Sequence, residues 1–340
     1  MKAALLSEYH CPLELVERPE PEPDGPRSVV VRIGGAGVCA TDLHAIDGLM
    51  EPAGLTLPVV LGHENAGWVH TVGDGVTTAA VGDAVLLYPA YSCGLCVPCR
   101  RGLDVHCERH EFTGLTLDGG FAEYVLVDER SLLKLPPGVE PSAVAPHADA
   151  GITAYHAVKK LLPRLAPGST AAVIGVGGVG HIALQLVQVL GAARVVAIDT
   201  DERRRRLANE LGADEVLGGQ EDVAGAVREL TNGAGADVVL DFVGTDETHA
   251  AGLGMLARRG LYSIVGYGGI VSHPSVGFVV GETTVVGNLV GSWIDLWELL
   301  QLHGRGDVTL RTETYSLEEV NDVLDRLREG EVTGRAVLVP

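Results

Sequence analysis

The chain has 340 residues, more than one hydrophobic core usually serves, so we expect about two domains. Its hydrophobic content of 46% is typical of a globular protein and excludes a disordered one. The net charge of −20, from 45 acidic against 25 basic residues, argues against nucleic acid or an anionic membrane as a partner.

The N-terminal part, residues 1 to about 148, has the pattern of β structure. Short β-branched or alternating runs lie between turns rich in proline and glycine, which favours strands. The runs are 28–33, 67–72, 84–87 and 121–127. The apolar run at the N-terminus is too short for a signal peptide, and no apolar stretch approaches about 18 residues without interruption. We therefore expect a cytoplasmic chain without a membrane span.

Cys39 and His63 lie in turn-like sequence rich in glycine and small residues, and they could form two legs of an open zinc site. The alternative is ordinary packing, because a lone cysteine is usually buried and a lone histidine usually has a structural partner. These two residues by themselves leave both interpretations open. Cys11 is assigned to ordinary packing.

Four of the six cysteines crowd into residues 93–107. In a cytosolic chain such a cluster is typical of metal ligands rather than of disulfides, and a redox dithiol would need only two thiols. Four thiolates complete the tetrahedral coordination of one Zn²⁺, so a structural zinc site is predicted. Its ligands would be Cys93, Cys96, Cys99 and Cys107.

From about residue 150 to 290 the predicted strands and helices alternate, which indicates a parallel sheet with helices on both faces. The predicted strands are 171–174, 194–198, 236–243 and 261–265. The predicted helices follow Gly180 and cover 202–211 and 245–258. The tail, 291–340, holds two helical patterns and a closing strand, Arg335–Val339.

A glycine motif stands between the first predicted strand and its helix. Gly175, Gly177 and Gly180 form a G-x-G-x-x-G that permits a tight turn, close approach of a pyrophosphate, and close packing of helix on strand. Gly178 and Val179 complete this candidate cofactor loop. The alternative is a glycine-rich turn in another kind of α/β domain.

Asp199 ends the next strand, about 20 residues beyond the motif. Its carboxylate can accept hydrogen bonds from both hydroxyls of an adenosine ribose and would repel a 2′-phosphate, which favours NAD over NADP. Arg203 and Arg204, just beyond it, weaken that preference.

These motifs, in their order and spacing, resemble the zinc-dependent medium-chain alcohol dehydrogenases over essentially the whole chain. The resemblance implies an α/β protein with a GroES-like β-rich catalytic domain at 1–150 and 291–340, including the zinc lobe at 93–107. It implies a Rossmann doubly wound parallel sheet at 151–290 that binds NAD. It also implies a homo-oligomer, a tetramer in preference to a dimer, paired through sheet edges near 284–290.

The resemblance assigns a role to each matching residue. Cys39 and His63 match ligands of a catalytic zinc, Glu64 an acid behind the metal, and Asp42 a carboxylate that orients the ligand histidine. Thr41 matches the hydroxyl that binds the substrate alcohol and starts a proton relay through the nicotinamide ribose to His44. The matched cofactor contacts are Thr153, Val265 and Gly266 on the nicotinamide side and Arg335 at the pyrophosphate.

The third zinc ligand is where this chain departs from most relatives, which carry a cysteine before Ala-Gly-Ile/Val-Thr. Asp149 stands there, as in a subgroup that acts on secondary alcohols and ketones. Thiolate and carboxylate carry the same charge, and the harder oxygen donor leaves the metal more Lewis acidic. His147 or Glu64 could compete as a ligand, although a packed histidine is the simpler interpretation of His147. Ala40 is a second departure, because many relatives have a basic residue there near the cofactor phosphates.

The resemblance implies a zinc-dependent oxidoreductase that transfers a hydride between NAD(H) and an alcohol, ketone or aldehyde, with two zinc ions per chain. The pocket candidates Ile46, Tyr88, Tyr91 and Trp293 favour a hydrophobic secondary or primary alcohol. One alternative is a polyol or sugar dehydrogenase of the same family. Another, from a different class, is a non-catalytic NAD-sensing zinc protein.

Overall fold

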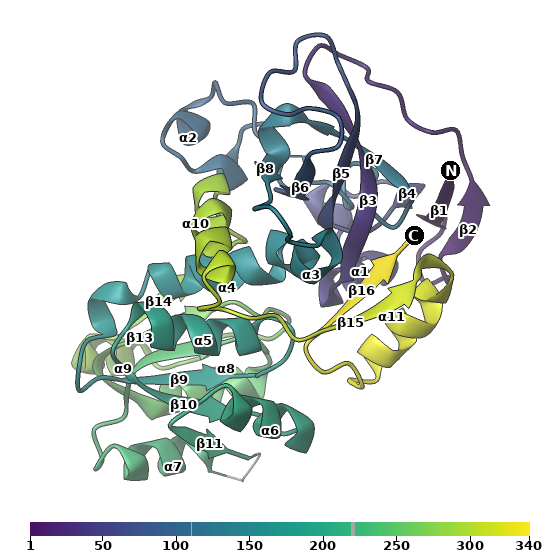
Figure 1. The fold of residues 1–340 in the computed structure, drawn as a ribbon. Helices are drawn as coiled ribbons and strands as arrows, with labels where there is room; N and C mark the ends of the chain where they lie inside the picture. Colours follow the sequence, from purple (N-terminus) through teal and green to yellow (C-terminus); the bar gives the residue numbers. More distant parts are fainter. Residues whose placement is uncertain (110, 219–221) are drawn as a thin grey trace. The chain divides into compact units, whose positions relative to one another are not determined.

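The computed structural model describes residues 1–109, 111–218 and 222–340, which form two compact units (Figure 1). Unit 1 comprises Met1–Ile152, Gly291–Gly304 and Leu310–Pro340, and unit 2 comprises Thr153–Val290 and Arg305–Thr309. The segment 305–309 was expected with the C-terminal part of unit 1. It belongs to unit 2, where the Thr309 amide donates to Gln185 Oε1 at 2.9 Å.

Unit 1 is built on a seven-stranded sheet in the order β15-β16-β3-β5-β6-β8, with β7 paired to β3. Its pairings are antiparallel except for β15 with β16. The strands are β3 (Ser28–Val38), β5 (Glu64–Val72), β6 (Ala84–Leu87), β7 (Tyr124–Asp128), β8 (Leu132–Lys134), β15 (Thr312–Ser316) and β16 (Arg335–Val339). A smaller sheet, β2-β1-β4, contains β1 (Lys2–Leu6), β2 (Glu14–Glu17) and β4 (Val59–Val60). The predicted β-rich character is confirmed.

Short helices connect these strands. They are α1 (Ala40–Ile46), α2 (Val97–Arg100), α3 (Pro141–Val144), α10 (Trp293–Gly304) and α11 (Val320–Arg328), with 3₁₀ turns η1 (Glu51–Ala53), η2 (Asp104–His106), η3 (Glu129–Ser131), η4 (Ala145–Ala148) and η6 (Leu317–Glu319). The sequence pattern did not predict α1. Its N-cap is Cys39, which lacks the capping signature of Ser, Thr, Asp or Asn, while Asp42 at the third helical position accepts the Cys39 amide.

The core of unit 1 lies between the seven-stranded sheet and the elements packed on it. Buried side chains of β3, such as Val29 and Val31, belong to one hydrophobic cluster with Phe121 and residues of α11 such as Val320. This enclosed core holds the ends of β3, β5 and β16 in fixed register, which is what positions the site described below.

Unit 2 contains a six-stranded, all-parallel sheet in the order β11-β10-β9-β12-β13-β14. The strands are β9 (Thr170–Ile174), β10 (Arg194–Ile198), β11 (Glu215–Leu217), β12 (Ala236–Asp241), β13 (Leu256–Ile264) and β14 (Thr284–Gly287). Its helical elements are α5 (Gly180–Leu190), α6 (Glu202–Glu210), α7 (Val223–Leu230), α8 (Asp246–Met255), α9 (Ser275–Gly281) and the turn η5 (Leu162–Arg164), while α4 (Ala150–Lys159) starts in unit 1 and continues here. This is the predicted doubly wound Rossmann sheet.

The direction of winding reverses between β9 and β12. Right-handed crossovers place α5 and α6 on one face of the sheet and the later helices on the other, and ligands bind such sheets at the carboxyl ends of the strands beside the reversal. The helix expected over 245–258 ends earlier, at Met255. Buried Leu256 pairs with Ala236 of β12 and begins β13, so strand pairing overrides the local helical pattern.

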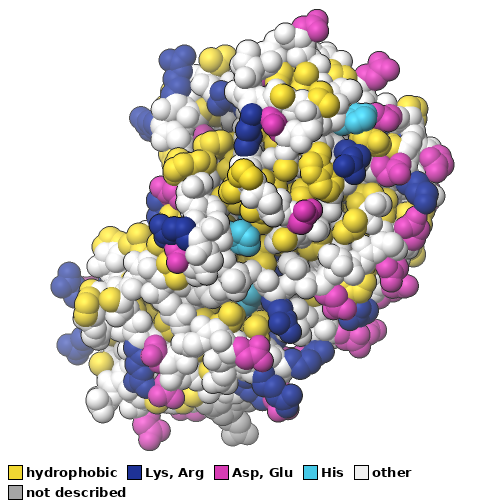
Figure 2. All heavy atoms as spheres, in the orientation of Figure 1, with side chains coloured by type: hydrophobic (Ala, Val, Ile, Leu, Met, Phe, Trp, Pro, Cys, Tyr) yellow, Lys and Arg dark blue, Asp and Glu magenta, His cyan; other side chains and the backbone are white. Residues whose placement is uncertain are grey.

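Acidic and basic side chains are interspersed on the face shown in Figure 2. Within the described ranges, no helix has both the length and the apolar character needed to cross a bilayer.

Candidate active site

Strand register brings the predicted catalytic residues of unit 1 together. The end of β3 lies beside the start of β5, because these antiparallel strands pair Gly37 with Glu64. Cys39 directly follows β3 and His63 directly precedes β5, so the two meet. Asp149 follows the turn η4, which contacts both strands.

The three candidate ligand atoms have the spacing of a tetrahedral metal site. Asp149 Oδ2 lies 3.6 Å from Cys39 Sγ and 3.5 Å from His63 Nε2. Tetrahedral zinc with ordinary bond lengths would set these ligand atoms about 3.6 Å and about 3.4 Å apart. Across the described residues, buried His63 Nε2 has no hydrogen-bond partner, an arrangement that a metal ion would satisfy. The donor set therefore fits Zn²⁺.

Asp42 supports two of these residues from behind. Its Oδ2 accepts the Cys39 amide at 2.8 Å, and its Oδ1 lies 3.2 Å from His63 Nδ1. Burial disfavours a charge on His63, but the carboxylates of Asp42 and Asp149 outweigh it and raise the pKa of His63 well above its usual value. The surroundings of this imidazole therefore favour positive charge.

Glu64 is the other acid within reach, and one of its oxygens is already engaged. Glu64 Oε1 accepts a hydrogen bond from Arg335 and another, at 3.0 Å, from the Ala150 amide beside Asp149. Burial raises the pKa of Glu64, an effect that the Arg335 guanidinium opposes, and Glu64 in turn helps to raise the pKa of buried Arg335. Arg335, for which a contact with the cofactor pyrophosphate stays a prediction, is held at this position because β16 pairs with the end of β3.

The proton-relay candidates share helix α1. Thr41 Oγ1 lies 3.7 Å from Cys39 Sγ, and Thr41 and His44 are both half-buried. Burial lowers the pKa of His44, Arg328 lowers it further, and Asp47 opposes them. A neutral imidazole on the helix that begins at the candidate ligand Cys39 can accept a proton.

His147, the rival zinc ligand, lies elsewhere. It is fully buried, and its Nε2 is 3.1 Å from Nδ1 of His303 in α10. At this site, the described residues whose possible ligand atoms lie close enough together to share a metal ion are Cys39, His63, Glu64 and Asp149, and His147 is not among them. The position of His147 agrees with the packed histidine of the simpler interpretation.

The four cysteines of the lobe also converge. Cys93 Sγ is 4.0 Å from Cys99 Sγ, and Cys96 Sγ is 4.0 Å from Cys107 Sγ. Sulfur atoms of a tetrahedral Zn(Cys)₄ site are about 3.8 Å apart, and each cysteine here is a free thiol.

Backbone amides favour an anionic sulfur at Cys93. The amides of Leu95 and Cys96 both donate to Cys93 Sγ at 3.4 Å and lower the pKa of that thiol to about 6. Arg130, which the sequence did not single out, donates to the Ser92 carbonyl at 2.9 Å and ties the lobe to the turn after β7.

Two expectations from sequence need correction. Tyr88 was expected in the substrate pocket, but its side chain is 1% exposed and its hydroxyl donates to the Gly291 carbonyl, so it is a core residue. Ile46 is also buried, whereas Tyr91 and Trp293 keep partial exposure. Cys11 is exposed between β1 and β2 and not packed as expected.

In unit 2 the glycine motif forms the turn between β9 and α5. Gly175 has φ +84°, and a Cβ there would lie 2.7 Å from Val243, so only glycine fits. A Cβ on Gly177 would meet nothing closer than Arg204 at 3.9 Å, which leaves this backbone open to a ligand. Gly178 and Val179 are likewise partly exposed at the start of α5.

Asp199 braces this loop. Its Oδ2 accepts the Val176 amide at 2.8 Å and its Oδ1 the Asp201 amide at 2.9 Å. Arg203 pairs with Asp201. His181 Nδ1 lies 2.9 Å from the Gly177 carbonyl, a contact that the sequence motif does not encode. Thr153, Val265 and Gly266 are all partly exposed in unit 2.

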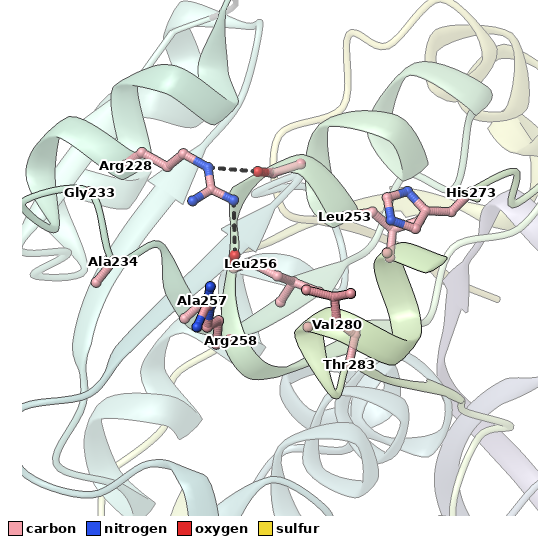
Figure 3. Close-up of a pocket in the computed structure, with 13 residues that line it drawn as sticks. Arg228, Gly233, Ala234, Leu253, Leu256, Ala257, Arg258, His273, Val280 and Thr283 are labelled. Atoms are coloured by element: carbon pink, nitrogen blue, oxygen red, sulfur yellow. Dashed lines mark hydrogen bonds between the residues drawn. The ribbon is translucent and has the colours of Figure 1, made fainter. Parts of the chain in front are cut away.

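A pocket of about 720 Å³ opens at the amino ends of β12 and β13, the edge opposite to the glycine turn (Figure 3). Arg228 lines it and donates to the carbonyls of Gly254 and Leu256. None of the residues predicted to bind cofactor or metal lines this pocket.

Known proteins share this fold and are similar in sequence over the whole chain. The alcohol dehydrogenase GroES-like domain family matches residues 25–137, and the zinc-binding dehydrogenase family matches residues 178–303. The crystal structure of the alcohol dehydrogenase from Aeropyrum pernix has a TM-score of 0.97 and 46% identity, with 100% of each chain covered.

Two curated relatives extend the comparison. An NAD-dependent alcohol dehydrogenase of Sulfurisphaera tokodaii is 35% identical over 100% of both chains. A D-arabinose 1-dehydrogenase (NADP(+)) of Saccharolobus solfataricus is 37% identical over 100% of this chain and 97% of its own. The chain belongs to the zinc-dependent medium-chain alcohol dehydrogenase family, whose members transfer a hydride between an alcohol and a nicotinamide cofactor.

Proposed function

We propose that this chain oxidises small hydrophobic alcohols, secondary ones above all, with NAD, and reduces the corresponding ketones or aldehydes in reverse. The observation that carries the proposal is the convergence of Cys39, His63 and Asp149 at the spacing of a tetrahedral zinc site. With three protein ligands, one coordination position is left for a substrate oxygen.

Cys39, His63 and Asp149 would hold the catalytic zinc, which as a Lewis acid stabilises negative charge on an alcohol or carbonyl oxygen. Asp42 orients His63 and strengthens its basicity. The Thr41 hydroxyl would hydrogen-bond to the substrate oxygen. The proton released by the alcohol would pass through Thr41 and the nicotinamide ribose to His44, and from His44 to water. Glu64, fixed by Arg335 and the Ala150 amide, holds the turn that carries Asp149.

Unit 2 would bind the cofactor. The open backbone at Gly177 and the N-terminus of α5 suit a pyrophosphate. Each carboxylate oxygen of Asp199 accepts one backbone amide and has a further lone pair that can accept a ribose hydroxyl. This supports NAD over NADP.

The cysteine lobe would hold a second, structural zinc, so each chain would carry two ions. All four coordination positions are filled by Cys93, Cys96, Cys99 and Cys107, which leaves no position for substrate. Free thiols in this lobe suit the reducing cytoplasm, where we place the protein.

We also propose a homotetramer assembled in part through unit 2. Strand β14 ends the parallel sheet, and apolar side chains of α9, the helix before it in the chain, are exposed, including Val276 at 65% and Val279 at 75%. An open sheet edge with exposed apolar residues favours pairing with a second copy. Light scattering at micromolar concentration should give four chain masses, and a monomer mass would refute the assembly.

A polyol or sugar dehydrogenase is the second candidate, favoured by the D-arabinose dehydrogenase among the relatives. The discriminating experiment follows NADH formation with 2-alkanols, 1-phenylethanol, sorbitol and D-arabinose. The proposal expects kcat/KM to be highest for the apolar alcohols. A preference for sorbitol or D-arabinose would support the second candidate, and no turnover with any alcohol would support a non-catalytic NAD-binding protein.

A further inference from the structure

Asp241 stands at the reversal point of the unit 2 sheet. It is the last residue of β12, it is fully buried, and it pairs with Ile174 of β9 on one side and Ile264 of β13 on the other. The turns that follow these three strands therefore start from one place, at the edge where parallel sheets bind their ligands.

This single residue fixes two of those turns. The Asp241 carbonyl accepts the amides of Val265 and Gly266, each at 2.9 Å. Asp241 Oδ1 accepts the amides of Val243 at 2.9 Å and Gly244 at 3.0 Å. Main chain and side chain of one aspartate thus hold the turn after β12 against the turn after β13.

The second carboxylate oxygen is held by a buried tyrosine and histidine. Tyr262 OH lies 2.6 Å from Asp241 Oδ2, and His249 Nδ1 lies 2.7 Å from the same hydroxyl. An ionised carboxylate only accepts, so Tyr262 donates to it and His249 donates to Tyr262. Burial, with help from Asp241, raises the pKa of Tyr262, which keeps the phenol a neutral donor.

The turns after β12 and β13 pack closely against each other beside this hydrogen-bond chain. A Cβ on Gly266 would lie 2.6 Å from the carbonyl carbons of Phe242 and Val243. Because these two turns touch backbone to backbone, a shift of the turn after β12 displaces the turn after β13.

We propose that Tyr262 and His249 are positioning residues for the nicotinamide half of the cofactor. They fix the Asp241 carboxylate, and Asp241 fixes the turns at 242–244 and 265–266, where Val265 and Gly266 are the proposed nicotinamide contacts. This rests on the proposed function. The adenosine half depends instead on Asp199 and the open backbone at Gly177, which the chain from His249 to Asp241 does not hold.

The test compares two ligands that share the adenosine half. In Tyr262→Phe, the dissociation constant for NADH should rise about tenfold, because Asp241 Oδ2 loses its hydroxyl donor and is left with only His249 Nδ1, which lies 3.5 Å away. The dissociation constant for ADP-ribose, which lacks nicotinamide, should stay within about twofold. His249→Leu should act like Tyr262→Phe, whereas His249→Asn, whose amide can still donate to Tyr262, should restore much of the NADH affinity.

The matched control is Tyr315→Phe, which removes a tyrosine hydroxyl paired with Arg326 in unit 1 and should change neither constant. If Tyr262→Phe does not fold, the two His249 variants decide the matter alone. Equal weakening of NADH and ADP-ribose, or no weakening of either, would overturn the positioning role. Wild-type protein that binds neither ligand would instead overturn the proposed function.

Discussion

Asp42 and His63 form a pair that is closed to solvent on both sides, with Asp42 Oδ1 3.2 Å from His63 Nδ1 and side chains 0% and 1% exposed. Such a carboxylate fixes the imidazole so that its other nitrogen faces the metal. The neighbouring oxygen of Asp42 holds the Cys39 amide, so one side chain aligns two of the three proposed ligands.

Asp42→Asn should therefore weaken zinc binding at the catalytic site about 10–100-fold while the cysteine lobe keeps its ion. Competition with a chromophoric chelator measures this affinity. Asp47→Asn, at the end of the same helix and paired with Arg328, is the control and should leave the affinity unchanged. Equal zinc affinity in Asp42→Asn and the wild type would show that Asp42 does not orient the zinc ligands.

The pH dependence of alcohol oxidation should follow His44. The relay needs a neutral imidazole, and the pKa of His44 is lowered from 6.5, so kcat/KM should fall only below that pH. Arg328 lowers this pKa and Asp47 raises it, so Arg328→Gln should move the fall to higher pH and Asp47→Asn to lower pH. Arg18→Gln, which breaks a surface pair with Asp118, should leave the profile in place. Shifts in the same direction for both variants would contradict the assignment.

Cofactor preference should depend on Asp199. Asp199→Gly removes the charge that repels a 2′-phosphate and should shift the ratio of kcat/KM for NADP to that for NAD upward by about tenfold. Activity with NAD should also fall, because the Val176 and Asp201 amides lose their acceptor. Glu202→Gln, a nearby exposed acid paired with Arg206, is the control. A wild-type enzyme that prefers NADP would contradict the role of Asp199 in selecting NAD.

Metal analysis should give two zinc ions per chain. Brief chelation should remove the ion at the three-ligand site and abolish activity, while the closed four-cysteine site releases its ion more slowly. Cys107→Ser should lose one ion, and Cys11→Ser, which changes an exposed thiol outside both clusters, should keep two. A single ion in fully active protein would refute the two-site account.

Structural features that depend only on neighbouring residues were predictable from sequence. The strand, glycine turn, helix and strand from 171 to 199 follow from local periodicity, and the cysteine lobe follows from spacing. Helix α1 was missed because a cysteine serves as its N-cap. The helix predicted to end at residue 258 was too long, because Leu256 pairs with Ala236 and begins β13.

Relationships between distant segments were not predictable. Glu64 meets Arg335 only because β5 and β16 both flank β3. Tyr262, His249 and Asp241 come together through sheet register and the packing of α8, and no motif marks them. The position of Asp149 was inferred from a resemblance, since nothing in its own neighbourhood predicts that it reaches Cys39 and His63.

The central claim is that Asp149 ligates the catalytic zinc. Diffraction data collected at the zinc absorption edge from the metal-loaded protein test it most directly. An Asp149 oxygen should lie about 2.0–2.2 Å from the ion, with Cys39 and His63 as the other protein ligands and His147 still paired with His303. Asp149 outside bonding distance, with His147 or Glu64 bound to the zinc in its place, would contradict the account.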